Sequence, residues 1–202
     1  SLVEMAALAR SMGIQALARP AHLASDMARV DDAPRDAVEQ LERDHPRADA
    51  VVILYGNVPV RPEGCIDRAL ELLFSSQADS VQSYQPVGKH HPWWTARVGA
   101  DGVVAPWEGD VLNHGVFRRQ DLPPAYMPDG GVIAVTRASL FTVVEGQPHA
   151  FLGTDRRGIE NPQGSVIDID SPVDLLVAEA LLAGERRPHG GERLPDHMEC
   201  PQ

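Results

Sequence analysis

The sequence has few residues that could bind a polyanion such as nucleic acid or an anionic membrane surface. It contains a single lysine, Lys89, and only 18 basic residues against 29 acidic ones, which gives a net charge of −11. Arginines scattered over such an acidic chain do not form a continuous basic face. We therefore expect no nucleic-acid partner and no membrane partner, and arginine is the side chain that would bind any anionic substrate.

Cysteine and long hydrophobic segments are also scarce. The two cysteines, Cys65 and Cys200, lack the spacing of a metal or redox motif and are too few for a secreted disulfide framework. No apolar run approaches the roughly 20 residues that cross a bilayer, and residues 1–20 lack the layout of a signal peptide. The P-loop and nucleophile-elbow motifs are absent as well. These absences favour a soluble, cytoplasmic protein.

Helix-like and strand-like segments alternate along most of the chain. Amphipathic periodicity predicts helices at 2–12, 32–42, 65–74 and 172–184. Short apolar runs predict strands at 14–17, 48–55, 80–84, 131–136 and 166–170, with a hairpin between 93–98 and 102–107. The alternation favours an α/β fold of Rossmann-like type, with flanking helices on a mostly parallel sheet. We expect one domain over 1–184 and a disordered tail over 185–202.

Two carboxylates interrupt the last apolar run and are the strongest chemical signal. Asp168 and Asp170 alternate with Ile167 and Ile169, so in a strand the two acids share one face about 7 Å apart. Such a pair repels unless water or a cation lies between the carboxylates. Mg²⁺ is typically bound by one or two carboxylates, together with water and substrate phosphates. Two interpretations remain open, a magnesium site and a solvated strand end.

The residues that follow the acid pair predict the start of a helix. Ser171 is expected to be the N-cap, Pro172 the first helical residue, and Asp174 the capping-box acid that reaches back to the cap. Asp174 therefore has a structural explanation that Asp168 and Asp170 lack.

The loop 55–61 follows the clearest buried strand, and ligands of open α/β sheets bind beyond the carboxyl ends of the strands. Gly56 and Pro59 shape this loop, and Arg61 could pair with a phosphate or a carboxylate. An ordinary connecting loop explains the same residues. The sequence thus leaves both interpretations open for this loop.

Two further segments carry candidate binding groups. Arg118 and Arg119 are adjacent in a non-helical stretch, and because consecutive guanidinium groups tend to point apart, at most one should enter a site. The run 89–94 combines Lys89, two histidines and two tryptophans, which suits either a sugar-binding wall or an interface.

Taken in order, these segments resemble the acylneuraminate cytidylyltransferases, also called CMP-sialic acid synthetases, and their relatives for other nonulosonic acids. The resemblance extends to about residue 183. It is carried by the segments 19–26, 54–61, 79–81, 91–94, 119–126, 129–131 and 165–170. Any one of these motifs is weak, and their order and spacing make the resemblance specific.

The resemblance implies a fold of the nucleotide-diphospho-sugar transferase type and an activity. Enzymes of this family transfer CMP from CTP to an acidic nonulosonic sugar and release pyrophosphate in a Mg²⁺-dependent reaction. Asp168 and Asp170 match the metal-binding acids of the family, and Arg119 matches an arginine that faces the acidic sugar. The loop-rich excursion 86–128, with its three tryptophans, implies a homodimer contact.

The resemblance also implies substrate contacts, which depart in part from the family pattern. Tyr55, Asn57 and Arg61 lie in the loop that usually reads L-Q-P-T-S-P-L-R, and Asp129 replaces the asparagine of an N-G-A motif. Trp94 is the fifth expected substrate contact.

The family's first strand and its triphosphate loop, R-G-G-S-K-G, have no counterpart in the sequence. Either these elements lie upstream of Ser1, or the protein no longer handles CTP as the family does. Two alternatives stand beside the enzyme. One is a non-catalytic homologue that acts as a binding or dimerisation module. The other is a nucleotidyltransferase for another sugar.

Overall fold

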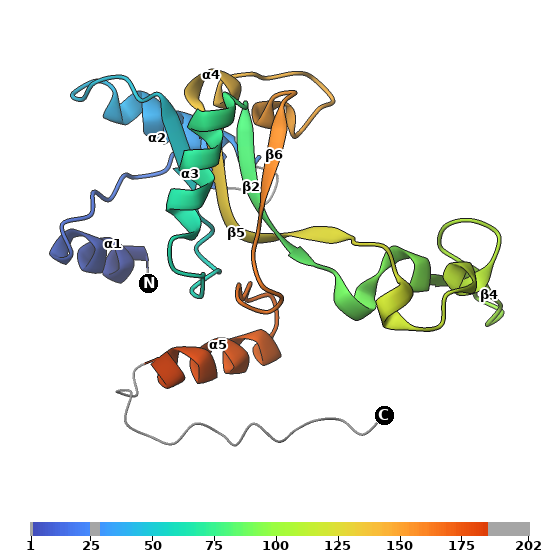
Figure 1. Cartoon of the computed structure of the whole chain (residues 1–202). Helices are drawn as coiled ribbons and strands as arrows, with labels where there is room; N and C mark the ends of the chain where they lie inside the picture. Colours follow the sequence, from blue (N-terminus) through green and yellow to red (C-terminus); the bar gives the residue numbers. More distant parts are fainter. Residues whose placement is uncertain (1, 25–28, 186–202) are drawn as a thin grey trace. The chain divides into compact units, whose positions relative to one another are not determined.

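A computed structural model describes residues 2–24 and 29–185 of the chain (Figure 1). The tail predicted for 185–202 lies outside the described residues, except for Glu185 at the end of a helix. The chain divides into two compact units. The first unit falls within Ser1–Ile53, Ile66–Gln82 and Val132–Ile159, and the second within Leu54–Cys65, Ser83–Gly131 and Glu160–Gln202.

The main sheet has four strands in the order β1-β5-β2-β6. The strands are β1 (Ala50–Ile53), β2 (Ser80–Pro86), β5 (Tyr126–Thr136) and β6 (Arg156–Glu160). Strands β1 and β5 are antiparallel, with Ala50 opposite Thr136 and Ile53 opposite Ile133. A separate antiparallel hairpin joins β3 (Ala96–Val98) to β4 (Val104–Pro106), which confirms the predicted hairpin with shorter strands.

The prediction of a mostly parallel sheet is wrong, because β5 runs against both of its neighbours. Beside β2, the Thr136 N–H donates to the Asp79 carbonyl, and the Val87 N–H donates to the Ala125 carbonyl. The segment 87–125 between β2 and β5 holds 3₁₀ turns and the small hairpin. A parallel partner needs a crossover that carries the chain back to the starting edge, whereas a direct return gives an antiparallel strand. The fold is α/β with a mixed sheet and flanking helices.

The four predicted helices begin and end close to their predicted bounds. They are α1 (Leu2–Ser11), α2 (Asp32–Leu41), α3 (Cys65–Ser76) and α5 (Pro172–Glu185). A further short helix is α4 (Arg137–Leu140). Short 3₁₀ helices are η1 (Ala21–Ala24), η2 (Gly88–His90), η3 (Pro92–Trp94), η4 (Leu112–Gly115), η5 (Arg119–Asp121) and η6 (Ala150–Leu152). In Figure 1, α2, α3 and α4 lie around the strands of the first unit.

Two predicted strands do not form. Residues 14–17 have no strand structure, and Ile14 is exposed instead of packed in a sheet. In the stretch 166–170, only Ile167 makes an isolated bridge, to Val60. The opposing loop contains Pro59, which has no N–H to donate, so a continuous ladder cannot continue there.

The core of the first unit is built on the inner half of β5. All four residues from Val132 to Val135 are buried, as expected for a strand covered on both faces. Leu73 of α3, Leu140 of α4 and Phe151 of η6 are also almost completely buried. The predicted apolar strand at 131–136 is thus confirmed as the centre of this core.

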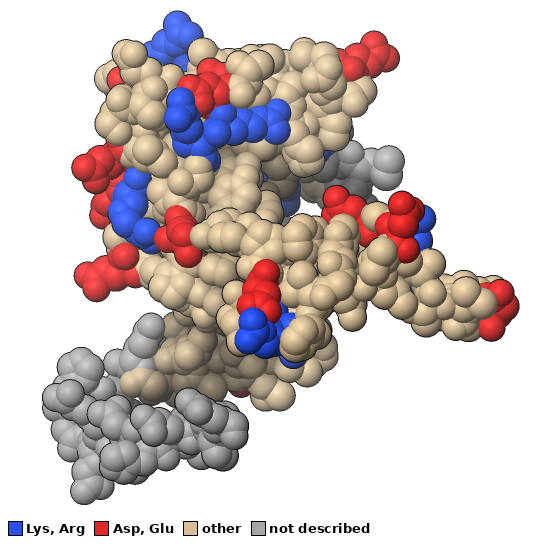
Figure 2. Space-filling view, turned by 45° about the vertical axis from the view of Figure 1, so that its right-hand side comes forward, with Lys and Arg blue, Asp and Glu red and all other residues tan. Residues whose placement is uncertain are grey.

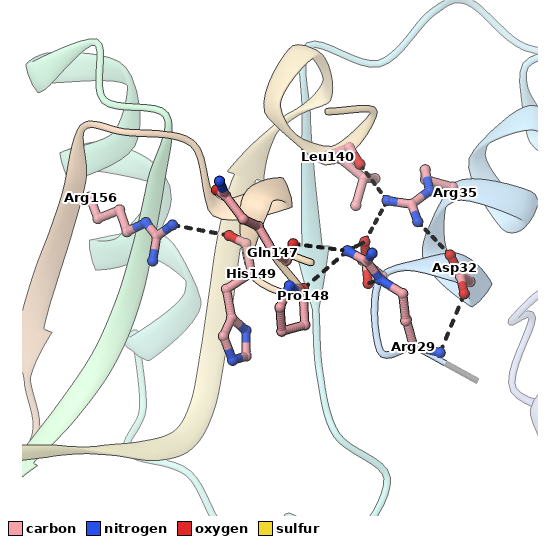
Figure 3. Close-up of polar contacts among 9 residues, drawn as sticks. Arg29, Asp32, Arg35, Leu140, Gln147, Pro148, His149 and Arg156 are labelled. Carbon is pink, nitrogen blue, oxygen red and sulfur yellow. Dashed lines mark hydrogen bonds and ion pairs between the residues drawn. The ribbon is translucent and has the colours of Figure 1, made fainter. Parts of the chain in front are cut away.

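A buried ion-pair cluster fixes the start of α2 in the first unit (Figure 3). Asp31, only 1% exposed, accepts hydrogen bonds from Arg29 at 3.0 Å and from Arg35 at 2.6 Å. The two arginines also donate to the carbonyls of Pro148 and Leu140, respectively. Burial alone would raise the pKa of Asp31, but the hydrogen bonds from the two guanidinium groups outweigh it and the pKa is lowered. The cluster therefore connects the start of α2 to the end of α4 and to the segment that follows α4.

Charge is mixed on the face of the molecule shown in Figure 2, where basic side chains lie singly or in small groups among acidic ones. The excess of 29 acidic over 18 basic residues accounts for this mixture. Among the described residues, no helix is long and apolar enough to cross a membrane.

Candidate functional site

In the second unit, the loop after β1 lies against the segment that contains the acid pair. The Ile169 N–H donates to the Asn57 carbonyl at 2.9 Å, and the Ile167 N–H donates to the Val60 carbonyl at 3.3 Å. Asp168 and Asp170 are exposed, whereas the two isoleucines are half-buried. The predicted alternation is confirmed, although the segment is not a regular strand.

The side-chain amide of Asn57 lies between the two carboxylates. Its Nδ2 atom is 2.6 Å from Oδ1 of Asp168 and 3.5 Å from Oδ1 of Asp170. One NH₂ group thus donates to both acids, so their oxygens converge on a single point. The contact of Asn57 with substrate stays a prediction, whereas its contact with the acid pair is shown by the structure.

Negative charge is concentrated around Asp168. Although Asp168 is exposed, partial desolvation of its carboxyl group by the surrounding protein raises its pKa, and the charges of Asp170 and Asp174 raise the pKa further. The pKa of Tyr55 is also raised, first by burial and then by the charge of Asp168. A divalent cation between the acids would relieve this repulsion.

The carboxylates of Asp168 and Asp170 suit Mg²⁺ better than a cation whose ligands must all come from the protein. Within residues 2–24 and 29–185, no group of three or more His, Cys, Asp or Glu side chains is placed to hold a metal. Mg²⁺ commonly uses one or two carboxylates and keeps its other positions for water and phosphate oxygens. Asp168 and Asp170 match that requirement.

Asp174 has the structural role that the sequence predicts. Its Oδ2 atom accepts hydrogen bonds from the Ser171 hydroxyl at 2.7 Å and from the Ser171 N–H at 2.8 Å. These bonds lower the pKa of Asp174, and the Asp170 N–H adds a third bond at 3.2 Å. The predicted reach of Asp174 back to the residue that precedes α5 is confirmed, and the same carboxylate also holds the backbone of Asp170.

Arg61 stabilises the loop 55–61 through hydrogen bonds within the second unit. Its Nε donates to the Gly131 carbonyl at 2.8 Å and its Nη2 donates to the Tyr55 carbonyl at 2.9 Å. Burial lowers the pKa of this guanidinium group. The contact of Arg61 with substrate stays a prediction, and the contacts shown fix the two ends of the loop 55–61.

Asp129 is buried and hydrogen-bonded through both carboxylate oxygens. Its Oδ1 accepts from the Ser83 hydroxyl and from the Gly131 N–H, and its Oδ2 accepts from Nδ2 of Asn161 at 2.9 Å. The contact of Asp129 with substrate stays a prediction. Sequence reasoning missed Ser83 and Asn161, since single polar residues in a strand and a loop carry no motif.

We expect Asp129→Ala to destabilise the chain by about 3 kcal/mol, because three buried donors lose their acceptor. Asp129→Asn should cost about 1 kcal/mol, since the amide oxygen can still accept from Ser83 and Gly131 while its NH₂ faces the NH₂ of Asn161. Urea unfolding measures both values, with Asp110→Ala as the exposed control. Equal stability of Asp129→Ala and the control would show that the buried network contributes nothing.

Arg119 lies on the wall of a pocket of about 210 Å³ in the second unit. The pocket is lined by Pro86, Val87, Gly88, His91, Arg119, Leu122, Pro123, Pro124, Ala125 and Tyr126. Nη2 of Arg119 donates to Oε1 of Gln163 at 3.2 Å, whereas Arg118 pairs with Asp121 at 2.7 Å. Of the two arginines, Arg119 lines this pocket and Arg118 does not, and the entry of Arg119 into a functional site stays a prediction.

The aromatic run 91–94 is held within the excursion of the second unit. Buried His91 accepts a hydrogen bond at Nδ1 from the Trp93 N–H at 3.1 Å, and its Nε2 lies 3.1 Å from the Pro123 carbonyl. The Trp94 indole donates to the Val116 carbonyl at 2.9 Å. The predicted substrate contact of Trp94 stays a prediction, and His91 is a pocket residue that is not among the substrate contacts expected from the sequence.

Comparisons with known proteins agree with the resemblance found in the sequence. No protein-family model matches the chain. Over 120 residues, or 59% of its length, the chain is 30% identical to N-acylneuraminate cytidylyltransferase of Streptococcus agalactiae serotype V (strain ATCC BAA-611 / 2603 V/R). The match spans 27% of that relative, about a quarter of its length.

The fold is similar to a solved structure of CMP:2-keto-3-deoxy-manno-octonic acid synthetase complexed with CTP. The TM-score is 0.58 at 16% sequence identity, covering 90% of this chain and 78% of the other. The chain therefore has the mixed α/β fold of that synthetase. In sequence it is a distant homologue of N-acylneuraminate cytidylyltransferase, which confirms the predicted resemblance.

Proposed function

We propose that the protein transfers CMP from CTP to a sialic-acid-like nonulosonic acid, with release of pyrophosphate and with Mg²⁺ as cofactor. One observation carries the proposal: the exposed carboxylates of Asp168 and Asp170 converge on one point at the Asn57 amide. The distant homology to a cytidylyltransferase and the fold of a CTP-complexed synthetase support it. The loop 55–61 would contact the nucleotide through Tyr55 and Asn57.

The proposed chemistry depends on positioning and charge. Asp168 and Asp170 would hold Mg²⁺, which supplies positive charge beside the phosphates. Arg119 would bind the carboxylate of the sugar acid through two parallel hydrogen bonds. The oxygen of a sugar hydroxyl then forms a bond to the α-phosphorus and its proton passes to water, while the bond to the bridging oxygen breaks and pyrophosphate leaves. The protein contributes orientation and electrostatic stabilisation.

We also propose that the chain pairs with a second copy through the excursion 86–128. Trp107 and Phe117 in this excursion are 56% and 84% exposed, and Val98 and Leu112 are exposed as well. Exposed aromatic and aliphatic side chains of this kind are enriched at interfaces between subunits. Sedimentation equilibrium of the chain measures this association directly.

Pyrophosphate release tests the proposed activity. The chain is incubated with CTP, Mg²⁺ and a panel of nonulosonic acids, with ATP, GTP and UTP as alternative nucleotides. We expect release that needs CTP, one of the acids and Mg²⁺ together, and that stops when EDTA is added. No release with any acid, from a chain that is folded by circular dichroism, would contradict the activity.

A non-catalytic homologue is the second candidate, and two contacts in the second unit favour it. Arg61 and Asp129, both expected to face substrate, have their polar groups engaged by the protein itself. Such a module would bind CTP or a sugar acid, as measured by calorimetry, and would release no pyrophosphate. Turnover above the rate without protein excludes this candidate.

Arg119 and Arg118 form a matched pair for the test of sugar binding. We expect Arg119→Lys to raise KM for the sugar acid by about tenfold to a hundredfold, because a lysine cannot bind a carboxylate bidentately. Arg118→Lys should leave KM within about twofold, since Arg118 pairs with Asp121 at the surface. An equal effect of the two substitutions on KM would contradict the role of Arg119.

A further inference from the structure

We propose that Asn57 is a third oxygen ligand of the divalent cation that Asp168 and Asp170 would hold, and that its amide turns over when the cation binds. The inference rests on the proposed function, since it adds a residue to the same site. It starts from the short contact of 2.6 Å between Nδ2 of Asn57 and Asp168, with Asp170 at 3.5 Å.

The amide group can present either of two atoms at the same place. Nitrogen and oxygen are bonded to the same carbon, so half a turn about the Cβ–Cγ bond exchanges them almost exactly in position. With nitrogen toward the acids, the NH₂ group donates to both and offsets their repulsion. With oxygen toward them, three acceptors meet, which is favourable only around a cation. The orientation of the amide is therefore coupled to the presence of the cation.

The backbone around Asn57 allows this turn without a change of the loop. The Asn57 carbonyl is bonded to the Ile169 N–H, and the neighbouring bridge between Val60 and Ile167 holds the two segments together. The Asn57 side chain itself is exposed, so the rotating amide exchanges its outward contacts with water. Only one side-chain torsion has to change.

Three oxygens from the protein leave part of an octahedral Mg²⁺ shell for other ligands. Two charged carboxylates and one neutral amide oxygen would occupy three positions, and water and phosphate oxygens would take the others. A third ligand also fixes the cation relative to the loop 55–61, the segment expected to contact the nucleotide. Asn57 would thus position the cation with respect to CTP.

Binding of Mn²⁺ alone, followed by electron paramagnetic resonance with Mg²⁺ as competitor, tests the inference. We expect Asn57→Ala to raise the Kd for Mn²⁺ by about tenfold. Asn57→Asp should bind Mn²⁺ at least as tightly as the unchanged chain, because a carboxylate oxygen takes the place of the amide oxygen. Asn113→Gly is the control: it removes an exposed amide elsewhere in the second unit, and glycine accepts the positive φ of that position. Its Kd should be unchanged.

An unchanged or lower Kd in Asn57→Ala would overturn the inference, as would an Asn57→Asp variant that binds as weakly as Asn57→Ala.

A second readout uses the unsubstituted chain. On Mg²⁺ titration, the ¹⁵N side-chain amide signal of Asn57, assigned by its loss in Asn57→Ala, should shift as the NH₂ group leaves the carboxylates. A side-chain signal of Asn57 that stays in place, while the backbone amide signal of Asp170 shifts on Mg²⁺ binding, would exclude the turn. Absence of pyrophosphate release together with intact, Asn57-dependent Mn²⁺ binding would overturn the proposed function alone.

Discussion

Gly153→Ala is expected to destabilise the first unit by about 3 kcal/mol or more, because the substitution adds a steric overlap to a strained backbone. Gly153 follows η6 with φ 70° and ψ −159°, a region that is essentially restricted to glycine. A Cβ atom at this position would overlap the Cβ of Asp79 and come within 2.5 Å of its Cγ. Both the backbone and the space at Gly153 therefore exclude a side chain.

Asp79 cannot move aside, because its carboxylate is bound on several sides. Its Oδ2 accepts from the Thr154 N–H at 2.8 Å and from the Asp155 N–H at 2.9 Å, and its Oδ1 accepts from the Ser139 hydroxyl at 3.2 Å. The backbone N–H groups of Asp155 and Thr154 lower the pKa of Asp79. A lowered pKa means that this stabilisation is complete above the ordinary aspartate pKa and is lost as the pH falls through the lower value of the folded state.

Gly146→Ala provides the matched control. Gly146 also has a positive φ of 74°, but no atom lies within 4 Å of the position that a Cβ would take. Its substitution should cost only about 1–2 kcal/mol of backbone strain. Urea unfolding of both variants separates the steric overlap from the strain. Equal losses of stability in Gly153→Ala and Gly146→Ala would show that Asp79 does not prevent a side chain at position 153.

Asp168→Asn/Asp170→Asn is expected to lower the rate of pyrophosphate release by about a thousandfold. The cation would lose both of its charged ligands, and the phosphates would then lose the positive charge of the cation. The same change should leave the melting temperature equal or slightly higher. The pKa of Asp168 is raised by partial desolvation and by its acidic neighbours, so its charged form disfavours folding at neutral pH. Loss of activity without loss of stability is the expected signature.

Asp110→Asn is the control for this double substitution, since Asp110 is an exposed acid of the same unit. Turnover and melting temperature should both match those of the unchanged chain. A double variant that retains turnover would contradict the role of the acid pair. A double variant that unfolds at a clearly lower temperature would instead assign the two carboxylates to the stability of the fold.

The sequence predicted the elements whose side chains follow a clear period. The helices around Val38, Leu73 and Ala178 formed near their expected bounds, because one apolar side of each must be covered. Strand β6 was missed, since Arg156–Glu160 has a single apolar residue, Ile159, and lies at an edge of the sheet. The direction of β5 was also missed, because direction depends on the route of the chain between strands and not on the strand's own residues.

The candidate site was predictable only in part, for a similar reason. The alternation of Asp168 with isoleucines places the acids on one side from the sequence alone. That Asn57 lies between them depends on two backbone hydrogen bonds between segments more than 100 residues apart. The buried partners of Asp129 and the backbone contacts of Arg61 are likewise tertiary, and no local pattern contains them.

Calorimetric titration of the chain with CTP, in the presence of Mg²⁺ and then of EDTA, tests most directly the claim that the acid pair holds a cation for the nucleotide. We expect CTP binding that depends on Mg²⁺, is abolished in Asp168→Asn/Asp170→Asn and is unchanged in Asp110→Asn. The same affinity for CTP in EDTA as in Mg²⁺, or in the double variant as in the unchanged chain, would contradict it.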